Sequence, residues 1–172
     1  MKILYQGTEG AYSQLAALEV FPNANVISCK TFEDCFKRCI DDEDLSTIIP
    51  IENSIAGRVA DIQYLMNKYK LQIFSEHFHK VSHNLMAKPG IGIDKLKFVR
   101  SHSQAISQCQ KLINEFKLEP IIAADTAGSA KFISKNSLKE EAAIASSLAA
   151  KIYNLEKLKS NTDAIIIKTI KR

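Results

Sequence analysis

The sequence has no apolar run long enough to cross a membrane, and its first residues lack the apolar core of an export signal. The short apolar run in Met1–Gly7 predicts a strand instead. These absences favour a cytoplasmic protein with no membrane partner.

Paired cysteines and concentrated positive charge are also missing. The four cysteines form no CxxC pair and have no zinc-type spacing, which agrees with free thiols in a reducing compartment. Cys35 and Cys39, four residues apart on an expected helix, are predicted to pack as small apolar groups. The formal net charge is +4 with lysine and arginine scattered, so no nucleic-acid partner is expected.

What is present is typical of a globular protein with a real core. Its 172 residues, 46% hydrophobic and 24% charged, suit one domain or two small lobes. Apolar runs alternate with helical patterns along the chain, which predicts an α/β fold. The mild positive charge is compatible with a small anionic substrate.

The most informative stretch is residues 47–59. Thr47–Ile51 predicts a strand buried on both faces, and Glu52, Asn53 and Ser54 follow directly, before a helical pattern that begins at Ile55. Ligands of open α/β sheets bind outside the carboxyl ends of strands, where Asn53 and Ser54 would offer uncharged donors. The alternative is that they form only a turn and an N-cap.

The first loop of the chain also follows the carboxyl end of a predicted strand. A strand at Lys2–Gln6 is followed by the loop Gly7–Ser13 and a helix from Tyr12 to Phe21. Two glycines allow close approach of the backbone, and amides at a helix start bind anions. An ordinary βα turn is the alternative. A strand at Asn25–Cys29 and a helix capped by Thr31 come next.

Residues 71–88 predict a long extended segment that leaves one lobe and enters another. It carries His77, His79 and His83 at even spacing, so one strand would present them on one face. A metal triad is one interpretation, but isolated histidines are usually not ligands and no metal is expected.

In the second half, three strands end in hydroxyl-bearing turns at helix starts. The strands are expected at Leu96–Arg100, Pro120–Ala123 and Ala142–Ala145, and the first is followed by a helix over Ala105–Phe116. Each turn alone could be an N-cap, whereas three at equivalent positions suggest one polar cleft. The chain closes with a predicted polar turn at residues 160–163 and an apolar strand.

Six motifs in this order resemble those of prephenate dehydratases, over residues 3 to about 158. They are Gly7–Ser13, Pro50–Ser54, Glu76–Phe78 with His83–Leu85, Val99–His102 with Gln104, Asp125–Ala127, and Ala142–Ser146.

The resemblance implies two α/β lobes like a type 2 periplasmic binding protein, with the active site in the inter-lobe cleft. Lobe 1 would comprise residues 1–76 and 160–172, and lobe 2 residues 77–159. It also implies a homodimer or homotetramer that converts the small molecule prephenate to phenylpyruvate in phenylalanine biosynthesis. Aromatisation drives this lyase reaction, so no cofactor is implied.

Residues are carried over from the family only at matching motif positions. The implied catalytic residues are Thr162, Asn53 and Ser54. The implied substrate-binding residues are Thr8, Glu9, Gly10, Ala11, Ser13, Glu52, Ser101, His102, Gln104, Thr126 and Ala127, and Arg58 is added as a replacement for an arginine that this sequence lacks.

The chain departs from the family near its end. The family has Thr-Arg-Phe, whose arginine binds a substrate carboxylate, where this sequence has Thr162-Asp163-Ala164. Arg58 is a possible replacement. The family's usual C-terminal ACT domain has no counterpart here, so the sequence is expected to be either a separate catalytic domain without that control or a truncated or degenerate chain. A non-catalytic protein that binds aromatic metabolites and an arogenate dehydratase are the alternatives.

Overall fold

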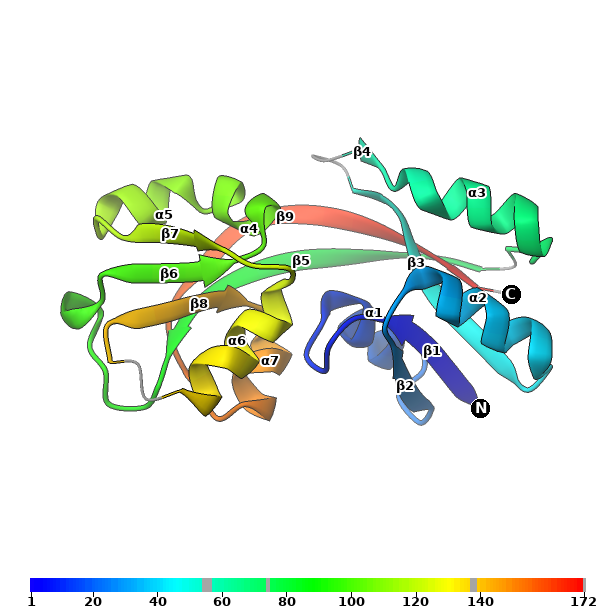
Figure 1. The fold of residues 1–172 in the computed structure, drawn as a ribbon, viewed down its shortest axis with the longest axis horizontal. Helices are drawn as coiled ribbons and strands as arrows, with labels where there is room; N and C mark the ends of the chain where they lie inside the picture. The colour runs from blue at the N-terminus through cyan, green and yellow to red at the C-terminus, as the bar shows by residue number, and fades with distance from the viewer. Residues whose placement is uncertain (54–56, 74, 137–138, 172) are drawn as a thin grey trace. The chain divides into compact units, whose positions relative to one another are not determined.

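The computed structural model describes residues 1–53, 57–73, 75–136 and 139–171 (Figure 1). Helices and strands alternate along the chain, and the predicted α/β class is confirmed. The chain divides into two units. The first comprises Met1–Thr8, Tyr12–Val81 and Ala164–Arg172, and the second comprises Glu9–Ala11 and Ser82–Asp163.

The first unit has a mostly parallel sheet. Its strand order is β2-β1-β3-β9, with β1 parallel to β2 and β3, β9 antiparallel to β3, and the short β4 paired with the end of β3. The elements are β1 (Lys2–Gln6), α1 (Tyr12–Val20), β2 (Asn25–Cys29), α2 (Phe32–Asp41), β3 (Leu45–Asn53), β4 (Gly57–Arg58), α3 (Ala60–Tyr69) and β9 (Glu156–Lys171).

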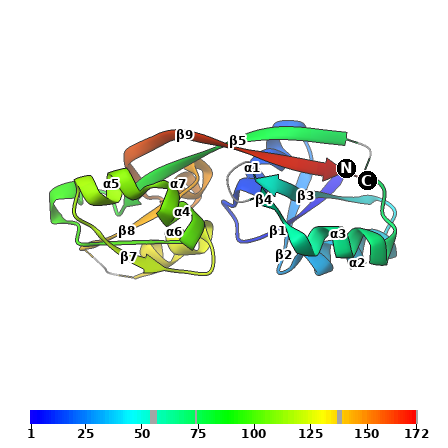
Figure 2. The same ribbon diagram turned by 90° about the horizontal axis from the view of Figure 1, so that it is seen from above.

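Helices α2 and α3 bury their apolar faces against this sheet (Figure 2). Thr31 and Asp34 form a capping box at the start of α2, which confirms the predicted cap. Cys35 and Cys39 form no disulfide and are fully buried, as predicted, and burial raises the pKa of the Cys35 thiol.

The second unit has helices on both faces of a sheet with the order β5-β8-β6-β7. Strand β6 is parallel to β7 and β8, and β5 is antiparallel to β8. The elements are β5 (Ser75–Ala87), a 3-10 turn at Ile93–Lys95, β6 (Phe98–Ser101), α4 (Ser103–Gln108), α5 (Gln110–Glu115), β7 (Glu119–Ile122), α6 (Thr126–Lys135), β8 (Glu141–Ala145) and α7 (Ser147–Ile152).

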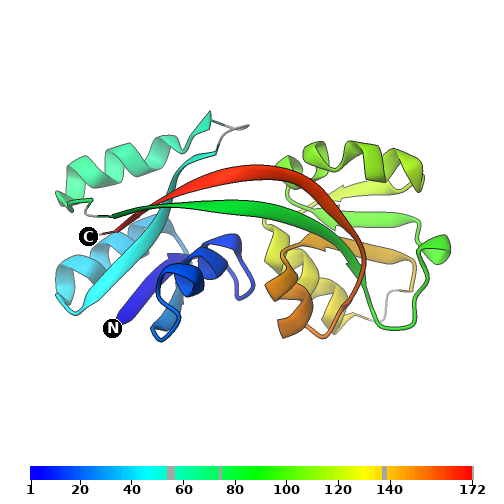
Figure 3. The ribbon, with the colours of Figure 1, turned by 180° about the vertical axis from the view of Figure 1, so that it is seen from behind.

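Alternation along the strands gives this sheet two separate cores. Leu85 of β5 and Ile144 of β8 pack under α4 and α5, whereas their neighbours Met86, Ala143 and Ala145 pack under α6 and α7. Strands β5 and β9, which are neighbours, each have residues in both units (Figure 3).

Three expectations from the sequence are wrong in detail. The predicted turn at residues 160–163 lies within β9, a strand that extends from Glu156 to Lys171 between β3 and β5. The predicted helix over Ala105–Phe116 breaks at Cys109 into α4 and α5. Helix α3 begins at Ala60 after Val59, rather than near Ile55, which lies outside the described residues. In the described part of the chain, no helix combines the length and apolarity that a membrane span requires.

Candidate functional site

In the first unit, predicted site residues lie just beyond the carboxyl ends of two neighbouring parallel strands. The register Lys2↔Leu45 to Tyr5↔Ile48 brings the ends of β1 and β3 to the same edge of the sheet. Thr8 follows β1, Ser13 lies in the first turn of α1, and Glu52 lies at the end of β3; all three side chains are half-buried. This is the position at which α/β sheets bind ligands.

Two further predicted residues of this edge are described only in part, and a third is not described. The backbone of Asn53 ends β3, and Arg58 lies in β4, where it pairs with Glu52 across the hairpin. The side chains of Asn53 and Arg58, and all of Ser54, lie outside the described residues.

In the second unit, the carboxyl end of β6 carries Ser101 and His102. Ser101 is fully buried, and its hydroxyl donates to the carbonyl oxygen of Ile144 in β8 at 2.7 Å. His102 is the N-cap of α4, and its Nδ1 accepts from the backbone N–H of Gln104 at 3.3 Å. The Ser101 hydroxyl therefore already donates its proton to a neighbouring strand of the sheet. The Gln104 side chain, in contrast, is exposed to solvent.

Thr126 and Ala127 are the first residues of α6 rather than parts of a turn. Asp125 caps the helix by accepting from the N–H of Gly128. Ala127 is fully buried in the core, so only its backbone can reach a ligand, whereas Thr126 is half-buried. The start of α6 thus offers a hydroxyl and backbone amides to an anion.

Glu9, Gly10 and Ala11 belong to the second unit, where α7 holds them. The buried Ser146 caps α7 by accepting from the N–H of Ala149, and its hydroxyl donates to the carbonyl oxygen of Gly10. Tyr153 donates to the carbonyl oxygen of Glu9 at 2.8 Å. Burial, and then the charges of Glu9 and Asp125, raise the pKa of Tyr153, so its hydroxyl stays protonated as a donor.

Gly10 allows this close approach. Its φ of +91° is unfavourable for other residues, and a Cβ there would lie 2.7 Å from the Cα of Ala149. The sequence motifs contained Ser146, but its role in holding Gly10 was not predicted, and neither was that of Tyr153. The signals available were a hydroxyl residue at a helix start and a tyrosine at the end of the same helix.

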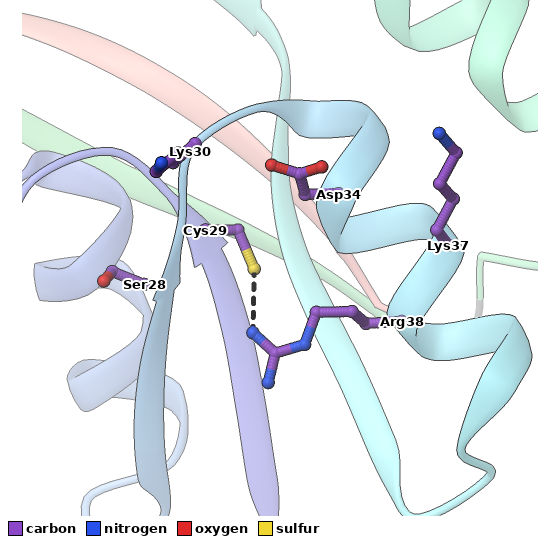
Figure 4. Close-up of a pocket in the computed structure, with 6 residues that line it drawn as sticks. All are labelled: Ser28, Cys29, Lys30, Asp34, Lys37 and Arg38. Carbon is purple, nitrogen blue, oxygen red and sulfur yellow. Dashed lines mark hydrogen bonds between the residues drawn. The ribbon is translucent and has the colours of Figure 1, made fainter.

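A surface hollow of about 370 Å³ lies elsewhere in the first unit, between β2 and the start of α2 (Figure 4). Arg38 donates to the Cys29 sulfur across it at 3.5 Å. None of its residues was predicted to bind a ligand. The lining consists of Ser28, Cys29, Lys30, Asp34, Lys37 and Arg38.

The three histidines of β5 do not form a triad. His83 belongs to the second unit, where its Nε2 lies 2.7 Å from Gln108 Oε1, and burial lowers its pKa. His77 and His79 belong to the first unit, where both contact Glu19. The interpretation of His77, His79 and His83 as one metal site is therefore wrong.

The parallel strands, with polar residues at their carboxyl ends, define an α/β protein of the kind whose ligands bind at that edge of the sheet. A sequence profile described as prephenate dehydratase matches residues 3–165, and the chain belongs to this family, as its motifs predicted.

Relatives and a solved structure extend this result. The chain is 36% identical over 161 residues to a bifunctional N-acyl-homoserine lactone acylase/prephenate dehydratase of Komagataeibacter europaeus, covering 94% of this chain and 57% of that protein. It is 37% identical over 158 residues to arogenate dehydratase/prephenate dehydratase 2 of Arabidopsis thaliana, covering 90% and 41%. The structure of prephenate dehydratase from Arthrobacter aurescens with L-Phe has a TM-score of 0.86 at 25% identity, covering 98% and 60%.

The chain therefore spans about 40 to 60% of the length of these proteins. The match extends over both units and over all the motifs that carried the resemblance.

Proposed function

We propose that this chain catalyses the decarboxylative dehydration of prephenate to phenylpyruvate, a carbon–oxygen lyase reaction of phenylalanine biosynthesis. The observation that carries the proposal is the family match over residues 3–165, which includes the polar residues at the strand ends of both units. The four buried cysteines form no disulfide, which favours a cytoplasmic setting. As in the family resemblance, we expect a homodimer or homotetramer, which light scattering would reveal.

The reaction defines what the residues must do. Prephenate loses its ring carboxylate as carbon dioxide and its ring hydroxyl as water, and the ring becomes aromatic. The protein must hold two carboxylates, remove water from the departing one and donate a proton to the leaving hydroxyl. Uncharged donors suit the departing carboxylate, because a strong cation there would stabilise the ground state.

We assign the proton donation to Thr162, and uncharged hydrogen bonding to Asn53 and Ser54. The backbone amides of Glu9–Ala11 and the start of α6 at Thr126 would bind the carboxylate that remains. Ser101 would act by positioning β6 against β8, since its proton is already donated to Ile144. Gln104 is exposed and can donate from its side chain.

The residues after Thr162 are the main departure from the family pattern. Asp163 and Ala164 stand where the family has arginine and phenylalanine. The substrate carboxylate that the family's arginine binds would therefore have to be bound by another group of this chain. Arg58, whose backbone lies opposite Glu52 in the β3–β4 hairpin, is the cation we propose for this role.

The test is to supply the purified chain with prephenate and with arogenate in parallel reactions. Phenylpyruvate from prephenate supports the proposal, whereas phenylalanine formed from arogenate alone would identify an arogenate dehydratase. A folded chain that binds prephenate in calorimetry without forming product would be a metabolite-binding protein. The Komagataeibacter europaeus relative adds a second candidate, N-acyl-homoserine lactone acylase activity, so release of a fatty acid from such a lactone forms a third assay.

A further inference from the structure

A cluster of metal-ligating side chains lies in the first unit and includes none of the proposed substrate-binding residues. Glu19, near the end of α1, lies against His77 and His79 of β5. One ligand atom from each of the three residues lies within 4.8 Å of the others. Among the residues that the structure describes, no other histidines, cysteines or carboxylates form such a group of three.

The geometry of the cluster is close to that of a metal site. His77 and His79 are two positions apart on β5, so both imidazoles lie on one face of the strand. Glu19 Oε2 lies 3.0 Å from His77 Nε2 and 2.8 Å from His79 Nδ1. Ligand atoms around a tetrahedral zinc ion lie about 3.4 Å apart, so an opening of about half an ångström would admit the ion.

The surroundings also favour an ion. The His79 side chain is only 5% exposed, whereas His77 and Glu19 are 32% and 47% exposed, so an ion can enter from solvent and keep a water molecule. Glu19 Oε2 already faces both imidazoles, so the carboxylate is placed to share one ion with them.

Metal binding would add no unpaired group to the interior. His79 Nε2 is buried and has no hydrogen-bond partner among the described residues, whether Nδ1 faces the carboxylate or an ion. The ring of Tyr12 lies beside the His79 ring, tilted and with centroids 6.3 Å apart. Burial and the contact with Glu19 orient the imidazole before an ion arrives.

We propose that Glu19, His77 and His79 bind one zinc-type divalent ion, with water as the fourth ligand. Two imidazoles and one carboxylate suit Zn²⁺ and its first-row neighbours, whereas Mg²⁺ and Ca²⁺ prefer oxygen ligands throughout. The ion would tie the end of α1 to β5. The site is independent of the proposed lyase chemistry, which needs no metal.

Calorimetric titration of zinc chloride into the chelator-treated protein tests the proposal, with magnesium chloride as the comparison salt. We expect one zinc ion per chain, no comparable magnesium binding, and zinc affinity lowered by at least about tenfold in His77→Gln and in Glu19→Gln. Both side chains are partly exposed, so these variants leave the core intact. Glu76→Gln is the matched control, because Glu76 precedes His77 and lies on the opposite face of β5.

Cobalt substitution identifies the ligand atoms. The three proposed ligands predict visible absorption bands of tetrahedral cobalt without the near-ultraviolet charge-transfer band of a thiolate, and predict their loss in His77→Gln. Zinc should also raise Tm for the parent chain and not for His77→Gln. The absence of zinc binding, unchanged affinity in both ligand variants, or a thiolate band from the buried cysteines would each overturn the proposal.

Discussion

Gly10 shows at the scale of one residue why the first loop has its conformation. Its φ is +91° and its α-carbon packs against the backbone of Ala149, while Ser146 bonds its carbonyl oxygen. The sequence predicted that a glycine here allows close approach, but it assigned that approach to a ligand. In the structure, the glycine instead approaches Ala149 of α7. Because Ala149 lies 139 positions away along the chain, the local sequence pattern could not reveal this contact.

We expect Gly10→Ala to destabilise the protein by about 3 kcal/mol, from positive-φ strain together with overlap against Ala149. Gly90→Ala is the matched control, because Gly90 has a φ of +79° but open space around the missing Cβ, and should cost only about 1 kcal/mol. Urea unfolding followed by far-ultraviolet circular dichroism measures both. Equal losses would contradict the packing argument.

Asp163 stands where the family has an arginine that binds a substrate carboxylate. Restoring the family's arginine with Asp163→Arg should lower the KM for prephenate about tenfold or more, because a charged hydrogen bond contributes about 1.5–3 kcal/mol. Asp163→Asn removes only the negative charge and should have a smaller effect. A KM unchanged in Asp163→Arg would show that this position does not face the substrate carboxylate.

At the scale of elements, local signals were sufficient where an element depends on its own sequence. The strands at Lys2–Gln6 and Asn25–Cys29 and the Thr31 cap occur as predicted. The prediction failed where residues far apart in the sequence determine the local structure. The polar run at residues 160–163 has turn-like composition, yet pairing with neighbouring strands keeps β9 extended. Glu19 could not be linked with His77 because α1 and β5 are far apart in sequence.

Helices α2 and α3 are joined by Glu33, and this contact has a defined pH dependence. Hydrogen bonds from Lys68 Nζ at 2.8 Å and Tyr69 Oη at 2.7 Å lower the pKa of Glu33 from 4.5 to about 2. A lowered folded-state pKa gives stability that is present above pH 4.5 and lost as the pH falls toward 2.

Glu33→Gln should therefore lower the urea midpoint at neutral pH, and the difference from the parent chain should disappear near pH 2. Glu43→Gln, in the exposed turn after α2, is the matched control and should show no such pH-dependent difference. A midpoint difference for Glu33→Gln that is constant with pH would contradict the assignment.

At the scale of the whole molecule, the residues proposed for the reaction are divided between the two units. Thr8, Ser13 and the end of β3 belong to the first unit, and Glu9–Ala11, Thr126 and Thr162 belong to the second. The order of the six motifs identified the family from sequence alone. Their local hydrogen bonding, such as the donation from Ser101 to Ile144, required the structure.

The most direct test measures phenylpyruvate formation from prephenate by the parent chain and Thr162→Ala, together with prephenate binding by calorimetry. Thr169→Ala, elsewhere in β9, is the control. We expect turnover by the parent chain and the control, and turnover reduced by about a hundredfold or more in Thr162→Ala with binding retained. Near-normal turnover in Thr162→Ala would contradict the role of Thr162, and binding without turnover by the parent chain would contradict the proposed lyase activity.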